Sequence, residues 1–302
     1  MATINTNMSA NVAANSLTRN ERSMAATMER LSTGIRINSA KDDAAGLAIT
    51  SKMTSQINGL NQAVRNANDA ISMIQVGEGT LKEVTNMLQR MRELAIQASS
   101  DSNTDADRTA LNNEFTQLRD EISRIAANTQ WNGTAIFAQT AAVSDKVFQV
   151  GSNASQTITV SFKNFDAGTT TNTANNSGDA TANSSFAALD VDGGSNTKNI
   201  ENLAITSRTG SNEAMFAMSA AIDAVNSQRA LLGASMSRLE FASDNLQNVA
   251  QNSAAARSRV LDADYAAETT ELARTQIIQQ AGTAMLSQAN QSQQSILALL
   301  QS

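Results

Sequence analysis

The sequence predicts a mainly α protein: an antiparallel helical bundle or coiled-coil rod, with a small β-rich subdomain in the middle of the chain. Three observations indicate this class. Apolar side chains recur at three- and four-residue steps over long stretches towards both ends, as in amphipathic helices. Proline, which breaks helix interiors, is absent from all 302 residues. Aromatic residues make up only 3% of the chain, so packing depends on aliphatic side chains, which suit narrow helical seams.

The composition excludes several kinds of function. Because the chain has no Cys and no His, it lacks disulfides and the residues of most metal and nucleophilic sites, and we expect no catalytic site, cofactor or metal. The net charge of −6 argues against nucleic acid as a partner. No stretch approaches the roughly 18 apolar residues of a membrane span. The first residues lack the features of a Sec-type signal peptide, so we expect either retention in the cell or export by another route.

The sequence predicts two helices that are separated by a turn near Gly34 and Asn38. Residues 1–33 carry a weak apolar stripe, and Gly34 and Asn38 interrupt the pattern. The segment from Ser39 to Asp42 is typical of a capping box, in which Ser39 accepts hydrogen bonds from free backbone amides of the next helix. That helix should run from about 44 to 99. Its spacing slips by one residue near Gly77, which predicts a local irregularity. Its seam residues are Leu60, Val64, Ala67, Ile71, Ile74, Leu81, Val84, Leu88, Met91, Ala95 and Ala98.

Three further helices follow from the same periodicity. One is capped by residues 104–107 and ends near 128, with Leu111, Phe115, Leu118, Ile122 and Ile125 on its core face. Another spans about 213–258, with Ile222, Val225, Leu232, Met236, Leu239 and Leu246 as its seam. The last follows the residues Asp262 to Tyr265 and continues towards the end of the chain. Its polar face is rich in Gln and Asn rather than Lys and Arg, which favours packing against partner helices over binding to a membrane surface.

The middle of the chain has a β pattern. Residues 146–151 and 157–162 alternate with a period of two, which predicts a hairpin or small sheet. Residues 166–199 consist mainly of Thr, Asn, Ser, Gly and Ala, and are either a surface loop or a small strand-rich lobe. We therefore expect three regions: terminal helices at 1–43 and 261–302, a helical rod at 44–140 and 200–260, and a β-rich, surface-exposed region at 141–199.

Three segments of the chain resemble signatures of the bacterial flagellin family. Residues 31–46, LSTGIRINSAKDDAAG, are similar to its N-terminal signature, and residues 256–266, ARSRVLDADYA, to its C-terminal counterpart. Residues 279–290, QQAGTAMLSQAN, match the family as well. The resemblance covers roughly the first 150 and the last 100 residues, in the order that the family requires.

The resemblance implies a structural subunit that polymerises into the bacterial flagellar filament for swimming motility, and that is secreted unfolded through the type III apparatus. The terminal helices would fold on assembly and form the inner filament layer. The partners implied are further copies of the chain in a helical homopolymer, which other flagellins could join, together with an export chaperone and the filament cap. The alternative is a hook–filament junction protein, which shares the terminal architecture. Assembly contacts are expected at Ile278, Met285, Ile296, Leu299 and Leu300.

A second site follows from the resemblance. Residues 89–97, QRMRELAIQ, are similar to the stretch that many flagellins present to the Toll-like flagellin receptor of animal hosts. Arg90, Leu94 and Gln97 fall on one helical stripe, and each precedes a seam residue by one position. We therefore expect them to flank the core and to be partly exposed, with Glu114 completing the patch. Lateral contact between subunits is the expected primary role of this stripe.

Overall fold

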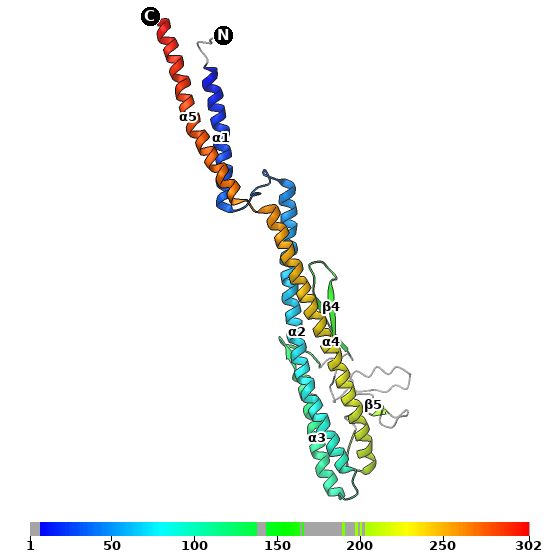
Figure 1. The fold of residues 1–302 in the computed structure, drawn as a ribbon. Coiled ribbons are helices and arrows are strands. Elements are labelled where there is room, and N and C mark those ends of the chain that lie inside the picture. The colour runs from blue at the N-terminus through cyan, green and yellow to red at the C-terminus, as the bar shows by residue number, and fades with distance from the viewer. Residues whose placement is uncertain are drawn as a thin grey trace. The chain divides into compact units, whose positions relative to one another are not determined.

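A computed structural model describes residues 7–137, 143–163, 165, 189–190, 197–198, 200 and 203–301, with side chains described except at 143–144, 189–190, 197–198 and 292–301. The described part is mainly helical, and its strands pair two by two in antiparallel fashion, so the predicted fold class is confirmed (Figure 1). The helices are α1 (Met8–Thr33), α2 (Ala44–Ala98), α3 (Asp105–Asn128), α4 (Arg208–Leu261) and α5 (Tyr265–Gln301). The strand pairs are β1 (Gln130–Trp131) with β2 (Thr134–Ala135), β3 (Val143–Gln149) with β4 (Thr157–Lys163), and β5 (Leu189–Asp190) with β6 (Thr197–Lys198).

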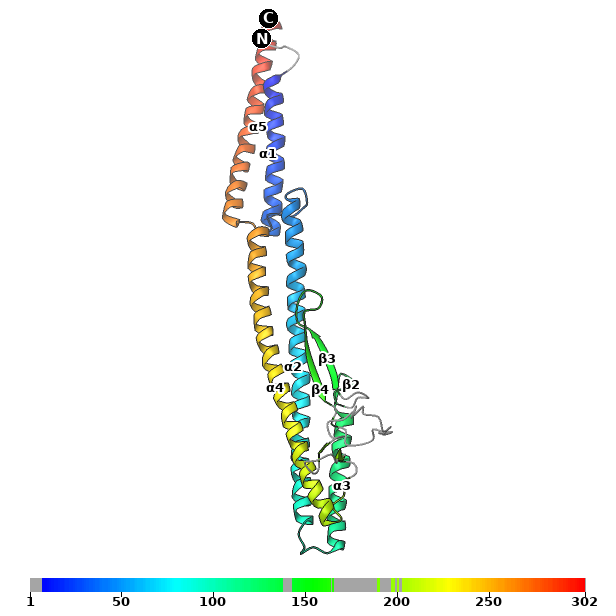
Figure 2. The ribbon, with the colours of Figure 1, turned by 90° about the vertical axis from the view of Figure 1, so that its right-hand side faces the viewer.

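The chain divides into two compact units. The first, here called the terminal unit, comprises Met1–Asn58 and Ala250–Ser302, and the second, the central unit, comprises Gly59–Val249. In the terminal unit α1 and α5 lie side by side and antiparallel (Figures 1 and 2). Most of the Thr-, Asn- and Ser-rich tract at 166–199 lies outside the described residues. The two structures predicted for it, a surface loop or a small strand-rich lobe, therefore stay predictions.

The turns that follow α1 and α4 pair with each other inside the terminal unit. The backbone amide of Arg36 donates to the carbonyl of Leu261 at 2.7 Å, and the amide of Ala263 donates to the carbonyl of Gly34 at 3.0 Å. The Arg36 guanidinium adds a hydrogen bond of 2.8 Å to the carbonyl of Val260. Gly34 has φ +71°, a left-handed conformation that glycine adopts without strain at the end of a helix. The segments 31–46 and 256–266, which resemble the two terminal flagellin signatures, are therefore joined by hydrogen bonds.

The predicted capping box at the start of α2 is wrong. The Asp42 carboxylate accepts from the amides of Asn38 (3.3 Å) and Ser39 (2.9 Å) and from the Ser39 hydroxyl (2.9 Å), which closes a turn before the helix. Asp43 caps α2 instead, because its Oδ1 accepts from the amide of Gly46 at 2.8 Å. Of the two adjacent aspartates, Asp42 accepts the hydrogen bonds of the turn, and Asp43 accepts one from a backbone amide at the start of α2. The hydrogen bonds from Ser39, first from its amide, lower the pKa of Asp42.

Two glycines of α2 provide a matched test of this helix start. A Cβ on Gly46 would collide with the Asp43 carboxylate and lie 2.6 Å from Cδ1 of Ile37, whereas a Cβ on Gly79 would meet nothing within 4 Å. We expect Gly46→Ala to lower the free energy of unfolding by about 1–3 kcal/mol, because the turn must shift. We expect Gly79→Ala to raise it by about 0.5–1 kcal/mol, because alanine favours the helix. Urea denaturation followed by circular dichroism measures both, and shifts of the same sign would contradict this account.

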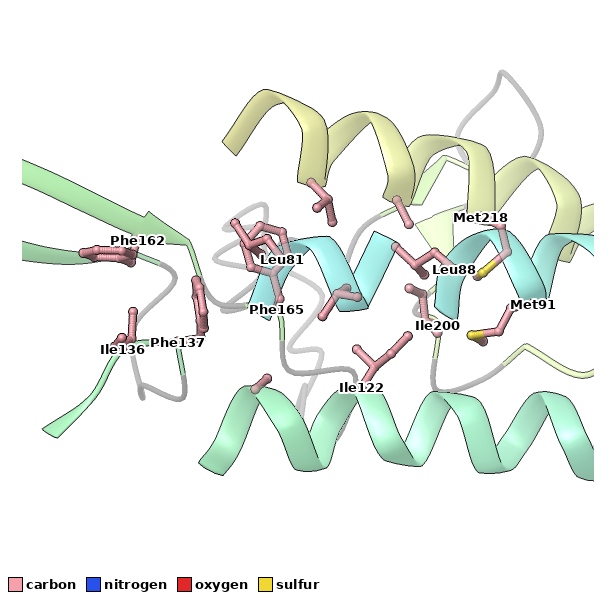
Figure 3. Packing of buried hydrophobic residues seen from close by; sticks show 14 of the residues in the cluster. Leu81, Leu88, Met91, Ile122, Ile136, Phe137, Phe162, Phe165, Ile200 and Met218 are labelled. Atoms are coloured by element: carbon pink, nitrogen blue, oxygen red, sulfur yellow. The ribbon is translucent and has the colours of Figure 1, made fainter. Parts of the chain in front are cut away.

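The core of the central unit lies between α2, α3 and α4, with α2 in the middle (Figure 3). The predicted seams are confirmed, since nearly all of their residues are buried or half-buried against one another. The predicted cap at residues 104–107 is also confirmed, and the structure shows that it is a capping box: the Thr104 hydroxyl accepts from the Asp107 amide, and the Asp107 carboxylate accepts from the Thr104 amide at 2.9 Å. The hydrogen bond from the Thr104 hydroxyl is the main cause that lowers the pKa of Asp107.

The predicted hairpin is confirmed as β3 and β4, and it packs on the central unit through its inward face. Ile158, Val160 and Phe162 of β4 are buried, in alternation with exposed neighbours. The ring of Phe137 stands edge-on to Phe162 and to Phe165, with centroids 6.0 and 5.9 Å apart. Two hydrogen bonds from side chains add to this packing. The side-chain amide of Asn66 donates to the carbonyl of Gln149 at 3.0 Å, and that of the buried Gln228 donates to the carbonyl of Ser161 at 2.7 Å.

The expected irregularity near Gly77 is wrong, because α2 is continuous from Ala44 to Ala98. A Cβ on Gly77 would lie 3.2 Å from the ring of Phe162 and 3.4 Å from that of Phe137. The glycine therefore allows the aromatic rings under the hairpin to approach the helix closely. The slip in apolar spacing therefore does not break the helix.

Candidate functional site

The terminal unit has an unusual distribution of side chains. On α1 the buried residues are Asn20 and Thr27, both polar, and on α5 Thr275 is buried. Large apolar side chains of the same helices are exposed instead. We call this set the terminal apolar surface: Met8, Val12 and Met28 of α1, with Tyr265, Ile277, Ile278 and Met285 of α5. Monomeric proteins seldom expose so many large apolar residues on two neighbouring helices, so this surface is typical of an interaction site.

The contacts between α1 and α5 explain this distribution. The Asn20 side chain donates to the carbonyl of Thr275 at 2.7 Å. Near the ends of the pair, the Asn7 side chain donates to the carbonyl of Ala289 at 3.1 Å, and Arg30 forms a salt bridge of 3.3 Å with Glu268. The helices approach closely through small and polar residues, and a Cβ on Gly282 would already lie 3.0 Å from Leu17. Leu17 is a large side chain that reaches this interface, whereas the seven side chains of the terminal apolar surface are exposed.

The predicted assembly residues on α5 fall on this exposed side where their side chains are described. Ile278 and Met285, seven positions apart and so on one stripe of the helix, are 42% and 65% exposed. Ile296, Leu299 and Leu300 belong to the last turns of α5, and their side chains lie outside the described ones. Their role in assembly stays a prediction.

Sequence reasoning missed a second exposed apolar set, on α4 of the central unit. Phe216, Leu231 and Phe241 are 61%, 53% and 76% exposed and, by helical spacing, lie within one narrow arc of the helix. They lie outside the predicted seam of α4. The signal was present as a second apolar stripe at steps of 15 and 10 residues, but the stronger seam masked it. We call these three residues the α4 stripe.

The Arg90 patch, consisting of Arg90, Gln97 and Glu114, is the part of the predicted receptor stripe that is accessible. The Arg90 guanidinium donates to the Glu114 carboxylate of α3 at 2.9 Å and to Glu93 at 3.2 Å. The hydrogen bond from Glu114 is the main cause that raises the pKa of Arg90. Both side chains are about half exposed and Gln97 is exposed, so an external partner could reach all three residues.

The expectation that Leu94 is partly exposed is wrong. Leu94 is 1% exposed and belongs to the core cluster of the central unit. The prediction assumed that α2 has one seam, but α2 lies between α3 and α4, which cover it from two sides (Figure 3). The buried arc of α2 is therefore wide enough to include both Leu94 and Ala95.

Two features are absent from the described residues, a cluster of possible metal ligands and a membrane-spanning helix. Among them, no group of three or more carboxylates could hold a metal ion. In the same ranges, no helix has the length and apolar character needed to cross a lipid bilayer. The candidate sites that the exposed residues define are three contact surfaces: the terminal apolar surface, the α4 stripe and the Arg90 patch.

Comparisons with known proteins agree on one family. The family model of the bacterial flagellin N-terminal helical region matches residues 4–142, and that of the bacterial flagellin C-terminal helical region matches residues 215–300. The flagellin of Halalkalibacterium halodurans is 42% identical over 273 residues, which cover 90% of each chain. The flagellin of Bacillus subtilis is 40% identical, over 98% of this chain and 99% of its own. A solved structure from Vibrio parahaemolyticus, described as a flagellar hook-associated protein, is similar in fold alone, with a TM-score of 0.54 and 16% identity over 73% of this chain and 100% of that one.

Proposed function

This chain belongs to the bacterial flagellin family and is a structural subunit of the extracellular flagellar filament, and we propose that α1 and α5 fold fully only when neighbouring subunits cover them. The observation that carries the proposal is the terminal apolar surface. The α1–α5 pair buries Asn20 and Thr275 but exposes large apolar side chains such as Ile277 and Met285. This distribution does not stabilise the pair as an independent fold. Copies of the same chain, packed around the pair, would cover those side chains.

The energetics favour folding that is coupled to assembly. Full burial of one Val, Ile or Met side chain contributes about 1.5–3 kcal/mol. The terminal apolar surface has six Val, Ile and Met side chains and Tyr265, which are 42–66% exposed, so covering them adds a stabilisation comparable to the whole stability of a small domain, about 5–15 kcal/mol. Isolated helices are marginal in water without packing of this kind. Contacts between non-identical surfaces that do not close into a ring then generate a helical filament.

The remaining roles follow from family membership and are part of the same proposal. The terminal helices at 1–43 and 261–302 form the inner layer of the filament, the helical regions at 44–140 and 200–260 the next layer, and residues 141–199 face solvent. The chain is exported unfolded, which suits a sequence without Cys or Pro, since no disulfide and no slow prolyl isomerisation delays refolding. An export chaperone covers the terminal segments before assembly, and a filament cap guides their folding at the tip.

Seeded growth tests this proposal. Purified subunits are mixed with short flagellar filament fragments and observed by negative-stain electron microscopy. We expect long filaments of uniform diameter, because each added subunit covers the terminal apolar surface of its neighbours. A hook–filament junction protein, the alternative function, would leave the fragments at their original length and the subunits in solution. That outcome would overturn the proposal.

The Arg90 patch supports a second function, capture by the Toll-like flagellin receptor of animal hosts. The patch joins α2 to α3 through the Arg90–Glu114 ion pair and presents a guanidinium and an amide on one exposed surface. Exposed Arg side chains are frequent anchors of protein interfaces. Lateral contact in the filament remains the primary role proposed for this patch, so the receptor would capture free subunits.

We expect Arg90→Ala to weaken binding of the monomer to the receptor ectodomain by about tenfold or more, as for a central interface arginine. Surface plasmon resonance with immobilised receptor measures this change. Arg124→Ala is the matched control, because Arg124 is also an exposed arginine with one intrahelical carboxylate partner, Glu121. Equal effects of the two substitutions would show that the receptor reads overall charge rather than the Arg90 patch.

A further inference from the structure

The exposure of the methionine side chains differs between the two units of the chain. Of those described, only Met8, Met28 and Met285 are exposed, at 61%, 52% and 65%. All three belong to α1 and α5 of the terminal unit, where they make up almost half of the terminal apolar surface. The described methionines of the central unit are instead buried or half-buried. These are Met73, Met87, Met91, Met215, Met218 and Met236.

This distribution makes the terminal helices the part of the molecule most open to sulfur oxidation. The chain has no cysteine, so methionine is its only oxidisable sulfur. Oxidation of a thioether follows its exposure, and core residues such as Met91 and Met218, both at 0%, are shielded. A mild oxidant should therefore modify Met8, Met28 and Met285 first.

We propose that Met8, Met28 and Met285 form an oxidation-sensitive set, whose conversion to sulfoxide by a peroxide prevents a free subunit from joining the filament. This inference rests on the proposed function, because it requires these side chains to be covered on assembly. In the reaction the thioether sulfur attacks hydrogen peroxide, an S–O bond forms and the O–O bond breaks. The sulfur loses two electrons, and the peroxide is reduced to one molecule of water after a proton transfer to the departing oxygen.

The position of Met285 explains why one oxygen atom would matter. Met285 lies between two hydrogen bonds that join α5 to α1, at Thr275 and Ala289, and it shares a stripe with Ile278. A sulfoxide is a strong hydrogen-bond acceptor, and burying it in an apolar interface without a donor is unfavourable. The hydrogen bonds and the salt bridge that join α1 to α5 are made by other residues. Oxidation would therefore act on contacts between subunits and leave the subunit fold intact.

The same geometry limits the effect to subunits that have not yet assembled. Once neighbours cover the terminal apolar surface, peroxide no longer reaches the three sulfur atoms. Existing filaments would thus survive an oxidant that stops their growth. Because methionine sulfoxide is reduced enzymatically, the block is reversible.

The test compares two triple variants of the full chain. Subunits are treated with hydrogen peroxide until mass spectrometry shows sulfoxide at Met8, Met28 and Met285, and then added to untreated seeds. We expect growth of the unaltered protein to fall by about tenfold or more, as expected for a polar group placed in an apolar contact. Met8→Leu/Met28→Leu/Met285→Leu should keep growing after the same treatment. The control Met87→Leu/Met215→Leu/Met236→Leu should lose growth like the unaltered protein.

Two further measurements keep the test decisive even where the leucine variant assembles poorly. Treatment of oxidised subunits with both methionine sulfoxide reductases should restore growth, and peptide mapping should find the three methionines oxidised at least about fivefold more slowly in filaments, because burial removes access. Normal growth of fully oxidised subunits, or equal oxidation rates in filaments and monomers, would overturn the inference. Failure of untreated subunits to extend seeds would instead contradict the proposed function.

Discussion

Subunits that lack residues 290–302 should remain monomeric when mixed with filament seeds, while their central unit unfolds as in the full chain. The deletion begins just beyond Ala289, whose carbonyl accepts the hydrogen bond from Asn7 at the described start of α1. The contacts of Asn20 with Thr275 and of Arg30 with Glu268 are retained. The deletion thus removes the last turns of α5, with Ile296, Leu299 and Leu300, without touching the core of the central unit. We expect assembly to be lost completely.

Sedimentation and electron microscopy measure the assembly, and urea denaturation measures the fold. The control is the full-length double substitution Asn290→Ala/Gln291→Ala, which alters two exposed polar residues and preserves the apolar ones. This control should form filaments at the normal rate. If the truncated subunits also formed filaments of normal length, the end of α5 would not be needed and the terminal-helix proposal would fail. A lower denaturation midpoint would show that the deletion harms the fold instead.

Local signals in the sequence were sufficient to predict most helices. Thr104 and Asp107 are three residues apart at the start of an apolar periodicity, and this spacing sets the capping box wherever the helix packs. The same holds for β4, where Ile158, Val160 and Phe162 alternate with polar residues. Such features depend on neighbours within a few positions of the chain. They do not require knowledge of which elements meet in space.

The errors arose where tertiary contacts decide the outcome. Leu94 is buried because helices cover α2 from two sides, which periodicity within α2 alone does not reveal. Gly77 lies under the ring of Phe162, 85 positions later in the chain, so its purpose could not be read from its neighbours. Likewise, the weak apolar stripe of residues 1–33 was predicted, but a stripe does not say whether its partner lies in the same chain or in another. The buried hydrogen bond from Asn20 to Thr275 shows that α1 pairs with α5 through other residues, and Met8 and Val12 stay exposed.

Replacing Phe162 by alanine should lower the free energy of unfolding of the monomer by about 3–5 kcal/mol, as for other buried Phe→Ala changes. Phe162 is fully buried, its ring packs edge-on against Phe137, and it lies against the close approach at Gly77. Removing the ring leaves a cavity beneath the β3–β4 hairpin and weakens its attachment to α2. Urea denaturation followed by circular dichroism gives the free energy, and the fluorescence of Trp131, the only Trp and packed against the same core, reports on this region directly.

Phe241→Ala is the matched control, because it removes the same side chain from α4 at a position that is 76% exposed. Its effect on the unfolding of the monomer should stay within about 0.5 kcal/mol, as for most surface substitutions. The two variants separate the roles of apolar residues in this subunit: Phe162 stabilises the fold, whereas the α4 stripe that contains Phe241 is left free for contacts outside it. If Phe162→Ala were as mild as Phe241→Ala, the hairpin would be an appendage rather than part of the core. The aromatic cluster beneath it would then add no stability to the central unit, and Gly77 would have no packing role.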